Sequence, residues 1–317
     1  MINTIILENC LSGLKKIPDN TIDCSVSSPP YWGLRDYGVE EQLGQESDFK
    51  EFVSKLIEIY SEIYRVLKPT GTCFVNLGDT YAGSGSGTTK NADISKYVEN
   101  SKQVYVLPNG TSKASQFRGT NLNKSLLMIP ERFAIGMLDN GWILRNQIIW
   151  HKPNQMPQSA TDRFTVDFEK IFFFVKQSTG YYFEQQLEPY TKPLDRWGGT
   201  DLEANGDSTW DNGTGQTSYR NRNMRPNPEG KNMRTVWSIN TVPYSEAHFA
   251  TYPEKLVERM IKSGCPENGV VLDPFMGAGT TGLVARKLNR NYVGFEINSE
   301  YKKIAENRIR NEIGLFI

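Results

Sequence analysis

The 317-residue sequence predicts an α/β protein with a sheet that contains buried parallel strands. The main observation is an apolar run that ends at Asp273 and leads into glycines with the spacing G-x-G-x-x-G, at Gly277, Gly279 and Gly282. A helical stretch follows, and a second apolar run ends at Glu296. A third strand pattern, at 21–27, delivers Ser28 to the same edge of such a sheet. The pattern of strand, glycine turn, helix and strand is typical of half of a Rossmann-like nucleotide site.

The ligand of this predicted site follows from its polar groups. The helix N-terminus favours an anionic group, and Glu296 can accept two ribose hydroxyls. Residues 273–275, Asp-Pro-Phe, separate the strand from the glycines, whereas a dinucleotide fingerprint starts its glycines at the strand end. We therefore expect Asp273 to be free to face a cation. S-adenosylmethionine fits, since it has an amino group, a carboxylate and an adenosine; a simple tight turn is the alternative.

Two motifs carry a resemblance to a known family. The segment Ser28-Pro29-Pro30-Tyr31 contains two prolines that keep Ser28 extended and leave the carbonyl oxygens of the turn unpaired. It resembles the catalytic motif of β-class, site-specific amino-group DNA methyltransferases, and residues 273–281 resemble their cofactor motif. The resemblance implies the catalytic residues Ser28, Pro29, Pro30 and Tyr31, and the cofactor-binding residues Asp273, Pro274, Phe275, Gly277, Gly279, Thr280, Thr281 and Glu296.

A further cofactor motif of this family resembles residues 248–253. It would wrap the methionine half of the ligand through His248, Phe249, Thr251 and Pro253. Because the catalytic motif precedes the cofactor motif, the resemblance implies a circularly permuted Rossmann-like methyltransferase fold, with both sites at the carboxyl edge of the sheet. The expected organisation is a catalytic half at 1–183 with a long loop at 82–123, a target-recognition insert at 184–240, and a cofactor-binding half at 241–317.

Local periodicity predicts the other elements. Asp48 and apolar residues at helical spacing predict a helix at 49–67 that residues 68–71 end, and an amphipathic stretch predicts another at 124–141. Pro253 begins the helix before the cofactor strand, and the last helix is expected at 300–310. Apolar or alternating runs predict strands at 2–7, 21–27, 72–77, 142–150 and 171–175.

Two polar residues at strand ends allow more than one interpretation. Asp79 could line a pocket or cap the next element, and the cap is slightly favoured. His151 could be a general base. With Lys152 beside it and no acid to orient it, we expect instead a loop position near DNA.

The charge distribution bears on DNA binding. Basic and acidic residues number 36 each, but between residues 90 and 145 the basic ones are in excess, as phosphate binding requires. The 184–240 segment is rich in Arg, Asn and Gln, which read base edges, although a solvated loop is the alternative. The residues expected to contact DNA are Arg220, Arg222, Arg225, Arg234, Lys113, Arg118 and Lys152.

The resemblance implies methyl transfer to an exocyclic amine of a flipped-out base in duplex DNA. Serine at position 28 resembles cytosine-N4 enzymes, whereas adenine-N6 enzymes usually carry Asp or Asn there, so N4 is favoured and N6 stays the alternative. An RNA or protein-glutamine methyltransferase and a non-catalytic nucleic-acid-binding relative are less favoured hypotheses. A cognate restriction endonuclease and a second copy in a homodimer are further partners to consider.

Composition favours a soluble protein. Hydrophobic residues make up 38% and the mean hydropathy is −0.51. There is no apolar run of membrane length and no secretory leader within the first 15 residues, so we expect a cytoplasmic location and no membrane contact. The cysteines never form C-x-x-C, so no metal site is expected and the thiols should be reduced and mostly buried.

Overall fold

The computed structural model describes residues 2–33, 39, 41–83, 113–190, 227, 229–242 and 252–314. The chain divides into two compact units, Met1–Glu184 with Thr235–Ile317, and Gln185–Arg234. No helix among the described residues is long and apolar enough to span a bilayer. The cysteines are all free and buried, as expected.

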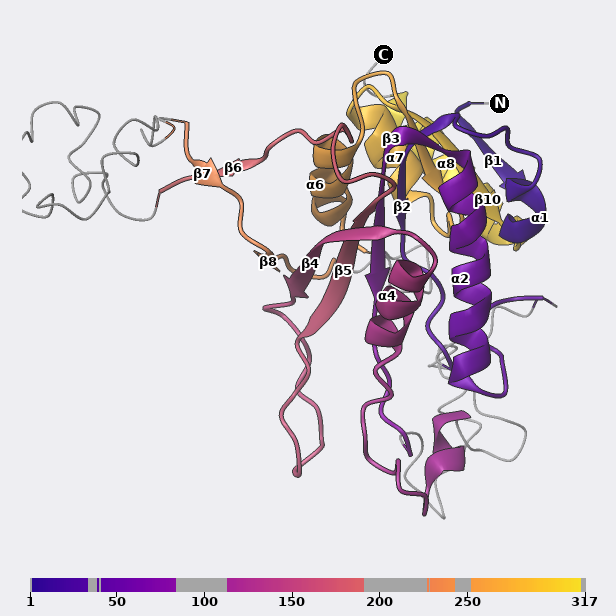
Figure 1. The fold of residues 1–317 in the computed structure, drawn as a ribbon, viewed down its shortest axis with the longest axis vertical. Coiled ribbons are helices and arrows are strands. Elements are labelled where there is room, and N and C mark those ends of the chain that lie inside the picture. The colour runs from indigo at the N-terminus through magenta and orange to yellow at the C-terminus, as the bar shows by residue number, and fades with distance from the viewer. Residues whose placement is uncertain are drawn as a thin grey trace, which may run out of the picture. The chain divides into compact units, whose positions relative to one another are not determined.

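The first unit is built on a mixed sheet (Figure 1). Among the described residues it has eight strands in the order β1-β10-β9-β2-β3-β5-β4-β8. Neighbouring strands from β1 to β3 run parallel, β5 is antiparallel to β3 and β4, and β8 is parallel to β4. The bounds are β1 Thr4–Leu7, β2 Ile22–Ser27, β3 Leu67–Leu77, β4 Ile143–His151, β5 Phe168–Val175, β8 Val236–Ser238, β9 Val270–Asp273 and β10 Asn291–Glu296. This α/β architecture confirms the predicted fold class.

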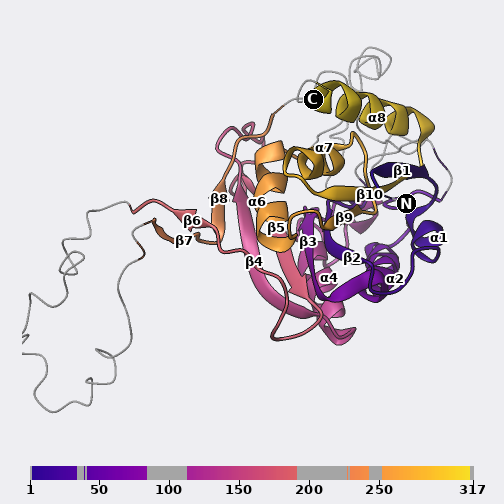
Figure 2. The same cartoon turned by 90° about the horizontal axis from the view of Figure 1, so that it is seen from above.

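Helices cover both faces of the sheet (Figure 2). On one face lie α1 Cys10–Leu14, α2 Phe49–Val66 and α4 Ile129–Asp139, and on the other lie α6 Glu254–Gly264, α7 Thr280–Lys287 and α8 Ser299–Ile313. A short 3₁₀ helix, η1, covers Lys113–Phe117. The two layers follow from the amphipathic helices, each of which must bury an apolar side against the sheet.

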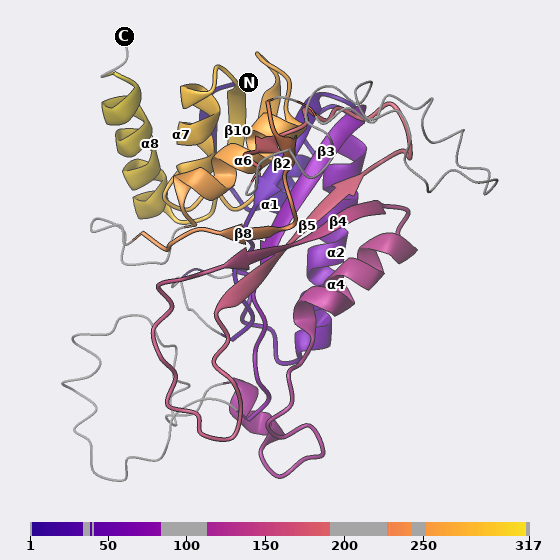
Figure 3. The same ribbon diagram turned by 90° about the vertical axis from the view of Figure 1, so that its left-hand side faces the viewer.

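Helix α2 confirms the predicted apolar periodicity. Its residues from Phe49 to Val66 bury one side, and the Asp48 side chain caps its first turn by accepting from the Lys50 amide. Tyr60 on this helix packs edge to face on Phe133 of α4, with ring centroids 5.0 Å apart. Figure 3 shows α2 and α4 together on the same face of β3, β4 and β5. The main apolar core lies between these two helices and the sheet.

Strand β3 begins earlier than predicted. The chain is extended from Leu67 rather than from residue 72. Pairing with β2 joins Ile22 to Leu67 and resumes only at Cys24 and Thr72, so β3 has several more residues than β2 across this interval. The intervening residues, which include Pro69, form an irregularity in the ladder, where a residue without an N–H is tolerated.

Helix α4 begins later than the predicted start at residue 124. Met128 has a left-handed backbone with φ 56°, and Pro130 occupies the first turn. The Asp79 carboxylate accepts hydrogen bonds from the amides of Met128 and Ile129, each at 3.1 Å. These amides have no partner inside the helix, so Asp79 caps it, as favoured from the sequence.

The second unit contains a short pair of antiparallel strands. Within its described part, β6 Leu187–Glu188 pairs antiparallel with β7 Lys231–Asn232. The hydroxyl of Tyr190 donates to the carbonyl of Gly230 at 3.1 Å, and Arg234 Nε donates to Glu188 Oε1 at 2.7 Å. The strand pair is thus held by both backbone and side-chain contacts.

Candidate active site

A cavity of about 510 Å³ lies where the two sequence motifs meet. Ser28 and Pro30 line it after β2, and Glu296 lines it at the end of β10. The segment after β9 contributes Pro274, Phe275, Gly277 and Thr280. Its volume is in the range of small-molecule sites. The fold therefore brings predicted catalytic and predicted cofactor residues to one cavity at the carboxyl edge of the sheet.

The glycine turn is shaped for close approach. Gly277 and Gly279 have φ of 51° and 78°, the left-handed region that favours glycine. Gly279 is the N-cap residue of α7, and a Cβ there would lie 2.8 Å from the Cβ of Ala305. Glu296 Oε2 accepts from the amide of Gly277 at 2.8 Å. The carboxylate thus fixes the turn while lining the cavity, and burial raises its pKa.

Asp273 does not face the cavity, which corrects the expectation that it is free to meet a cation. It is fully buried, and Oδ1 accepts from the amide of Phe275 at 2.9 Å. Oδ2 accepts from the hydroxyls of Tyr252 at 3.1 Å and Thr281 at 2.5 Å. Burial raises the pKa of Asp273 to about 6. Asp273 and the equally buried Thr281 therefore stabilise the segment 273–281 through hydrogen bonds inside the protein.

Carboxylates dominate the charge of the cavity lining. Lys55 is the one Lys or Arg among the described lining residues, whereas the acids are Glu8, Glu41, Glu46, Glu58 and Glu296. Glu46 is 6% exposed and lies 3.4 Å from Lys55 Nζ. Such a lining suits a positively charged ligand. Motif reasoning found Glu296 but missed the other four acids. Glu8 follows β1, Glu41 and Glu46 lie in the loop before α2, and Glu58 lies on α2, so only folding carries them into the site.

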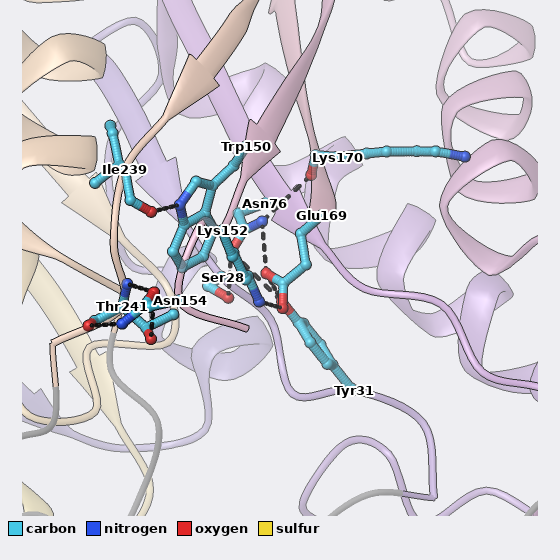
Figure 4. A network of polar contacts seen from close by, with 10 residues as sticks. All are labelled: Ser28, Tyr31, Asn76, Trp150, Lys152, Asn154, Glu169, Lys170, Ile239 and Thr241. Atoms are coloured by element: carbon cyan, nitrogen blue, oxygen red, sulfur yellow. Dashed lines mark hydrogen bonds and ion pairs between the residues drawn. The ribbon is translucent and has the colours of Figure 1, made fainter. Parts of the chain in front are cut away.

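A polar network lies beside Ser28 (Figure 4). Ser28 Oγ is 3.3 Å from Asn76 Oδ1, and Asn76 Nδ2 donates to Glu169 Oε2 at 3.1 Å. The Tyr31 hydroxyl donates to the same Glu169 oxygen at 2.6 Å. The other oxygen, Oε1, is paired with Lys152 Nζ, which also lies 4.4 Å from the ring centroid of Trp150. The network joins the catalytic motif to the ends of β3, β4 and β5.

Sequence reasoning missed Asn76 and Glu169. Asn76 lies in β3 and Glu169 in β5. Their side chains come into contact because β5 runs antiparallel to β3, where Asn76 is opposite Ile171. Lys152 was expected on DNA, yet its side chain is only 13% exposed and pairs with Glu169. Lys152 therefore belongs to the polar network beside Ser28.

The expectation for His151 is also wrong in two respects. It is the last residue of β4 rather than a loop residue. It has an acid beside it, since its Nε2 lies 3.6 Å from Asp167 Oδ2. Its Nδ1 is 3.0 Å from the Ser238 hydroxyl. Asp167 and Ser238 orient the ring at the edge of the sheet.

The other predicted residues are placed as follows. Pro29 is buried, and Pro253 precedes the first turn of α6. Lys113 Nζ donates to the Glu46 carbonyl at 3.2 Å, and Arg118 Nε to the Gly83 carbonyl at 3.4 Å. Arg220, Arg222, Arg225, His248, Phe249 and Thr251 lie outside the described residues. Among those described, no group of three or more His, Cys, Asp or Glu could hold a metal ion.

Comparison with known proteins agrees with this geometry. A family model described as DNA methylase, for N6 and N4 enzymes, matches residues 22–307. The Type II methyltransferase M.Cfr9I of Citrobacter freundii is 37% identical over 313 residues, covering 98% of this chain and 88% of the relative. The Type II methyltransferase M.SmaI of Serratia marcescens is 34% identical, covering 96% and 90%.

Solved structures share the fold. The PvuII DNA methyltransferase, described as cytosine-N4-specific, superposes with a TM-score of 0.61 at 18% identity, covering 96% of this chain and 85% of that one. A putative DNA modification methylase from Thermus thermophilus was solved with S-adenosyl-L-methionine. It superposes with a TM-score of 0.55 at 20% identity, covering 97% and 93%. At these identities the likeness concerns the fold alone.

Proposed function

The chain belongs to the DNA methylase family and uses S-adenosylmethionine, and on that basis we propose that it methylates the exocyclic N4 amine of a cytosine in duplex DNA. The observation that carries the proposal is the shared cavity of Ser28, the glycine turn and Glu296. A methyl donor held by the last two would have its reactive end within reach of an amine held at Ser28. The serine itself favours N4 over N6, as its resemblance to cytosine enzymes implies.

The residues of the cavity fit the cofactor. Glu296 has one lone pair engaged per oxygen, with the amides of Gly277 and Asn298, and the remaining lone pairs can accept ribose hydroxyls. The acidic lining favours the positive charge of the sulfonium and the ammonium group. When bound, the cofactor supplies an electrophilic methyl group. Asp273 contributes by fixing the loop that carries Phe275.

The target amine must be prepared by the protein, because its lone pair is delocalised into the base ring. Hydrogen bonds from the amine to Ser28 Oγ and the Pro29 carbonyl would localise that lone pair on nitrogen. The nitrogen would then bond to the methyl carbon as the carbon–sulfur bond breaks and its electron pair stays on the neutral thioether, and one amine proton would pass to solvent water. Holding the amine nitrogen in line with the methyl group would supply much of the rate enhancement. The nucleotide must be flipped out of the duplex, and Tyr31, fixed by its bond to Glu169, offers a ring on which the base stacks.

Adenine N6 is the alternative target of the same site. Ser28 and the Pro29 carbonyl are acceptors for either amine, so the walls of the base pocket would then decide the base. An RNA methyltransferase, a protein-glutamine methyltransferase and a non-catalytic relative have weaker support. The relatives that cover nearly the whole chain carry the name Type II methyltransferase.

DNA recognition is assigned to two segments. We propose that the unit Gln185–Arg234, with its Arg- and Asn-rich part, selects the sequence, and that the basic segment 90–124 adds general affinity. By analogy with the Type II relatives, the biological partner would be a restriction endonuclease that cuts the same sequence. A homodimer on DNA remains part of the proposal for partners.

Analysis of the methylated product tests the proposed function. Unmethylated DNA treated with the enzyme is digested to nucleosides, which are separated and identified by mass. N4-methyldeoxycytidine is the expected product, and Ser28→Ala should form it much more slowly with little change in cofactor affinity. N6-methyldeoxyadenosine would show that Ser28 does not decide the base. Methylation-aware sequencing of the same DNA gives the recognition sequence.

A further inference from the structure

The Asn76 amide is held in one orientation (Figure 4). Its Nδ2 lies 3.1 Å from Glu169 Oε2 and 3.3 Å from the carbonyl oxygen of Lys170. A carboxylate and a backbone carbonyl accept hydrogen bonds and donate none. The amide nitrogen must therefore face Glu169 and Lys170, and the amide oxygen must face the other way, toward Ser28 and Tyr31.

This orientation fixes the role of the Ser28 hydroxyl. The amide oxygen only accepts, so at 3.3 Å the single hydroxyl hydrogen of Ser28 points to Asn76. What Ser28 presents to the cavity that it lines is then its oxygen lone pairs. Toward a base in this cavity, Ser28 acts as a hydrogen-bond acceptor.

Glu169 is itself well held. Tyr31 and Asn76 donate to its Oε2, and Lys152 is paired with Oε1. The side chains of Lys152 and Glu169 are only 13% and 16% exposed, so the ion pair is largely removed from water. Such a carboxylate is a stable acceptor that keeps Asn76 from turning over.

We propose that Glu169 is a positioning residue that, through Asn76, holds Ser28 as an acceptor and so selects target bases that present an amino group over bases that present a carbonyl oxygen. Cytosine N4 and adenine N6 are donors, whereas the equivalent O4 of thymine or uracil and O6 of guanine are acceptors. A carbonyl opposite the Ser28 lone pairs would be left buried and unpaired, which strongly disfavours binding. This inference rests on the proposed function and extends it to base selection.

The variant Glu169→Gln is the sharpest perturbation. Its carbonyl oxygen can stay with Lys152, so its NH₂ group takes the place of Oε2 and faces the amide nitrogen of Asn76. The two donors conflict until Asn76 turns over. Asn76 then donates to Ser28, whose hydrogen is directed into the cavity, against the donor of the target amine. Amine methylation should therefore become slower without loss of the cofactor site.

A double-mutant cycle on turnover tests this route. We would measure kcat for methyl transfer to unmethylated phage DNA at saturating cofactor and DNA, for the wild type, Ser28→Ala, Glu169→Gln and the double variant. Each single change is expected to lower kcat about 10- to 100-fold, and the double variant should be within about twofold of Ser28→Ala. Glu258→Gln, which alters the exposed Lys262 pair of α6, is the matched control and should keep full activity.

The outcomes separate the two proposals. If the wild type methylates DNA and the two losses multiply, Glu169 does not act through Ser28 and the inference is overturned. If the wild type methylates no DNA, the proposed function fails first and the inference falls with it. Melting temperature and cofactor affinity of each variant show whether a loss of turnover reflects misfolding.

A second measurement needs no variant. One duplex carries the unmethylated target base at the mapped position, and the other carries the base in which a carbonyl oxygen replaces the amine. The pair is cytosine and uracil if the product is N4-methyldeoxycytidine, or adenine and hypoxanthine if it is N6-methyldeoxyadenosine. Each is placed opposite an abasic site, so that the cost of unpairing is equal. The wild type is expected to bind the amine duplex at least about tenfold more tightly. Equal binding of the two duplexes by the wild type would overturn the inference, whether or not Glu169→Gln folds. If Glu169→Gln folds, it should lose the preference for the amine duplex.

Discussion

Gly78 and Tyr31 are in such close contact that a side chain at position 78 would displace the Tyr31 ring. A Cβ built on Gly78 would lie 2.6 Å from Cε2 of Tyr31, closer than real Cβ contacts. Gly78 follows the last residue of β3, and Tyr31 ends the catalytic motif. The glycine thus sets where the ring on which a flipped base would stack can lie.

Gly78→Ala is accordingly expected to lower turnover about 10- to 100-fold, because the Tyr31 ring must move by a large fraction of an ångström. The φ of Gly78 is outside the left-handed region, so alanine adds little backbone strain. Steady-state kinetics and calorimetry would be compared, and cofactor affinity should be unchanged. Full activity of the variant would mean that the ring position is unimportant.

Cofactor affinity is expected to fall as the pH is lowered. Burial raises the pKa of Asp273 to about 6 and also raises the pKa of Glu296. A cationic ligand favours the ionised carboxylates, so their protonation as the pH falls through about 6 weakens binding. Calorimetric titrations between about pH 5 and about pH 7.5 measure the effect, which should be smaller in Asp273→Asn. A pH-independent affinity would contradict the acidic nature of the site.

Stability of the cofactor-free protein should show the opposite dependence. The pKa of Asp273 is about 6 when folded, against an ordinary value of 3.8, so between these values the folded protein binds a proton that the unfolded chain lacks. The contribution of this group to the free energy of unfolding therefore decreases as the pH rises through this window, by on the order of 2–3 kcal/mol. Asp273→Asn should be the more stable protein at neutral pH, by an amount that shrinks toward about pH 4. Urea unfolding measures the free energy of unfolding of both proteins across this pH range. A difference between them that does not change with pH would show that Asp273 does not titrate there.

Lys152→Ala is expected to lower turnover while leaving the salt dependence of DNA binding unchanged. Its ammonium group is paired with Glu169 and shielded from solvent, so it is not placed to neutralise a phosphate. Lys124, whose side chain is 76% exposed, belongs to the proposed general-affinity segment and is the comparison. The slope of log affinity against log salt should become shallower by about one in Lys124→Ala alone. The same change in Lys152→Ala would assign Lys152 to DNA.

Glu296→Ala should weaken cofactor binding by about 1.5–3 kcal/mol, the range for hydrogen bonds to a charged group. The carboxylate also anchors the amide of Gly277, so part of the loss reflects a looser turn. Calorimetry in the presence of a chelator measures the affinity of both proteins. Unchanged affinity in the variant, or loss of wild-type binding on chelation, would refute the cofactor assignment.

The sequence predicts those parts of the site that depend on local pattern. Ser28, Asp273 and Glu296 each end an apolar run, and the carboxyl ends of parallel strands meet at one edge, so their proximity follows from the fold class. The burial of Asp273 does not follow. It depends on Tyr252, which reaches the carboxylate from the segment that precedes α6.

The ion pair of Glu169 and Lys152 is a second feature of the site that the sequence does not predict. Each has an ordinary polar neighbourhood in the sequence, which gives no sign of a shared ion pair. They meet because β4 and β5 are antiparallel, with Trp150 opposite Glu169. Pairing between distant strands is a tertiary outcome, and a local pattern does not contain it.

The way the core holds the two ends of the segment Gln185–Arg234 bears on how this chain can vary in length. The amide of Glu184 donates to the carbonyl of Ser263 at 2.9 Å, and the carbonyl of Thr235 accepts from the amide of Ile149 at 2.8 Å. With both ends tied to the core, the entropy cost of closing the intervening chain grows only with the logarithm of its length. Insertions or deletions between these anchors would cost the core little free energy, so this part of the molecule can diversify while Ser28, Asn76 and Glu169 keep their geometry.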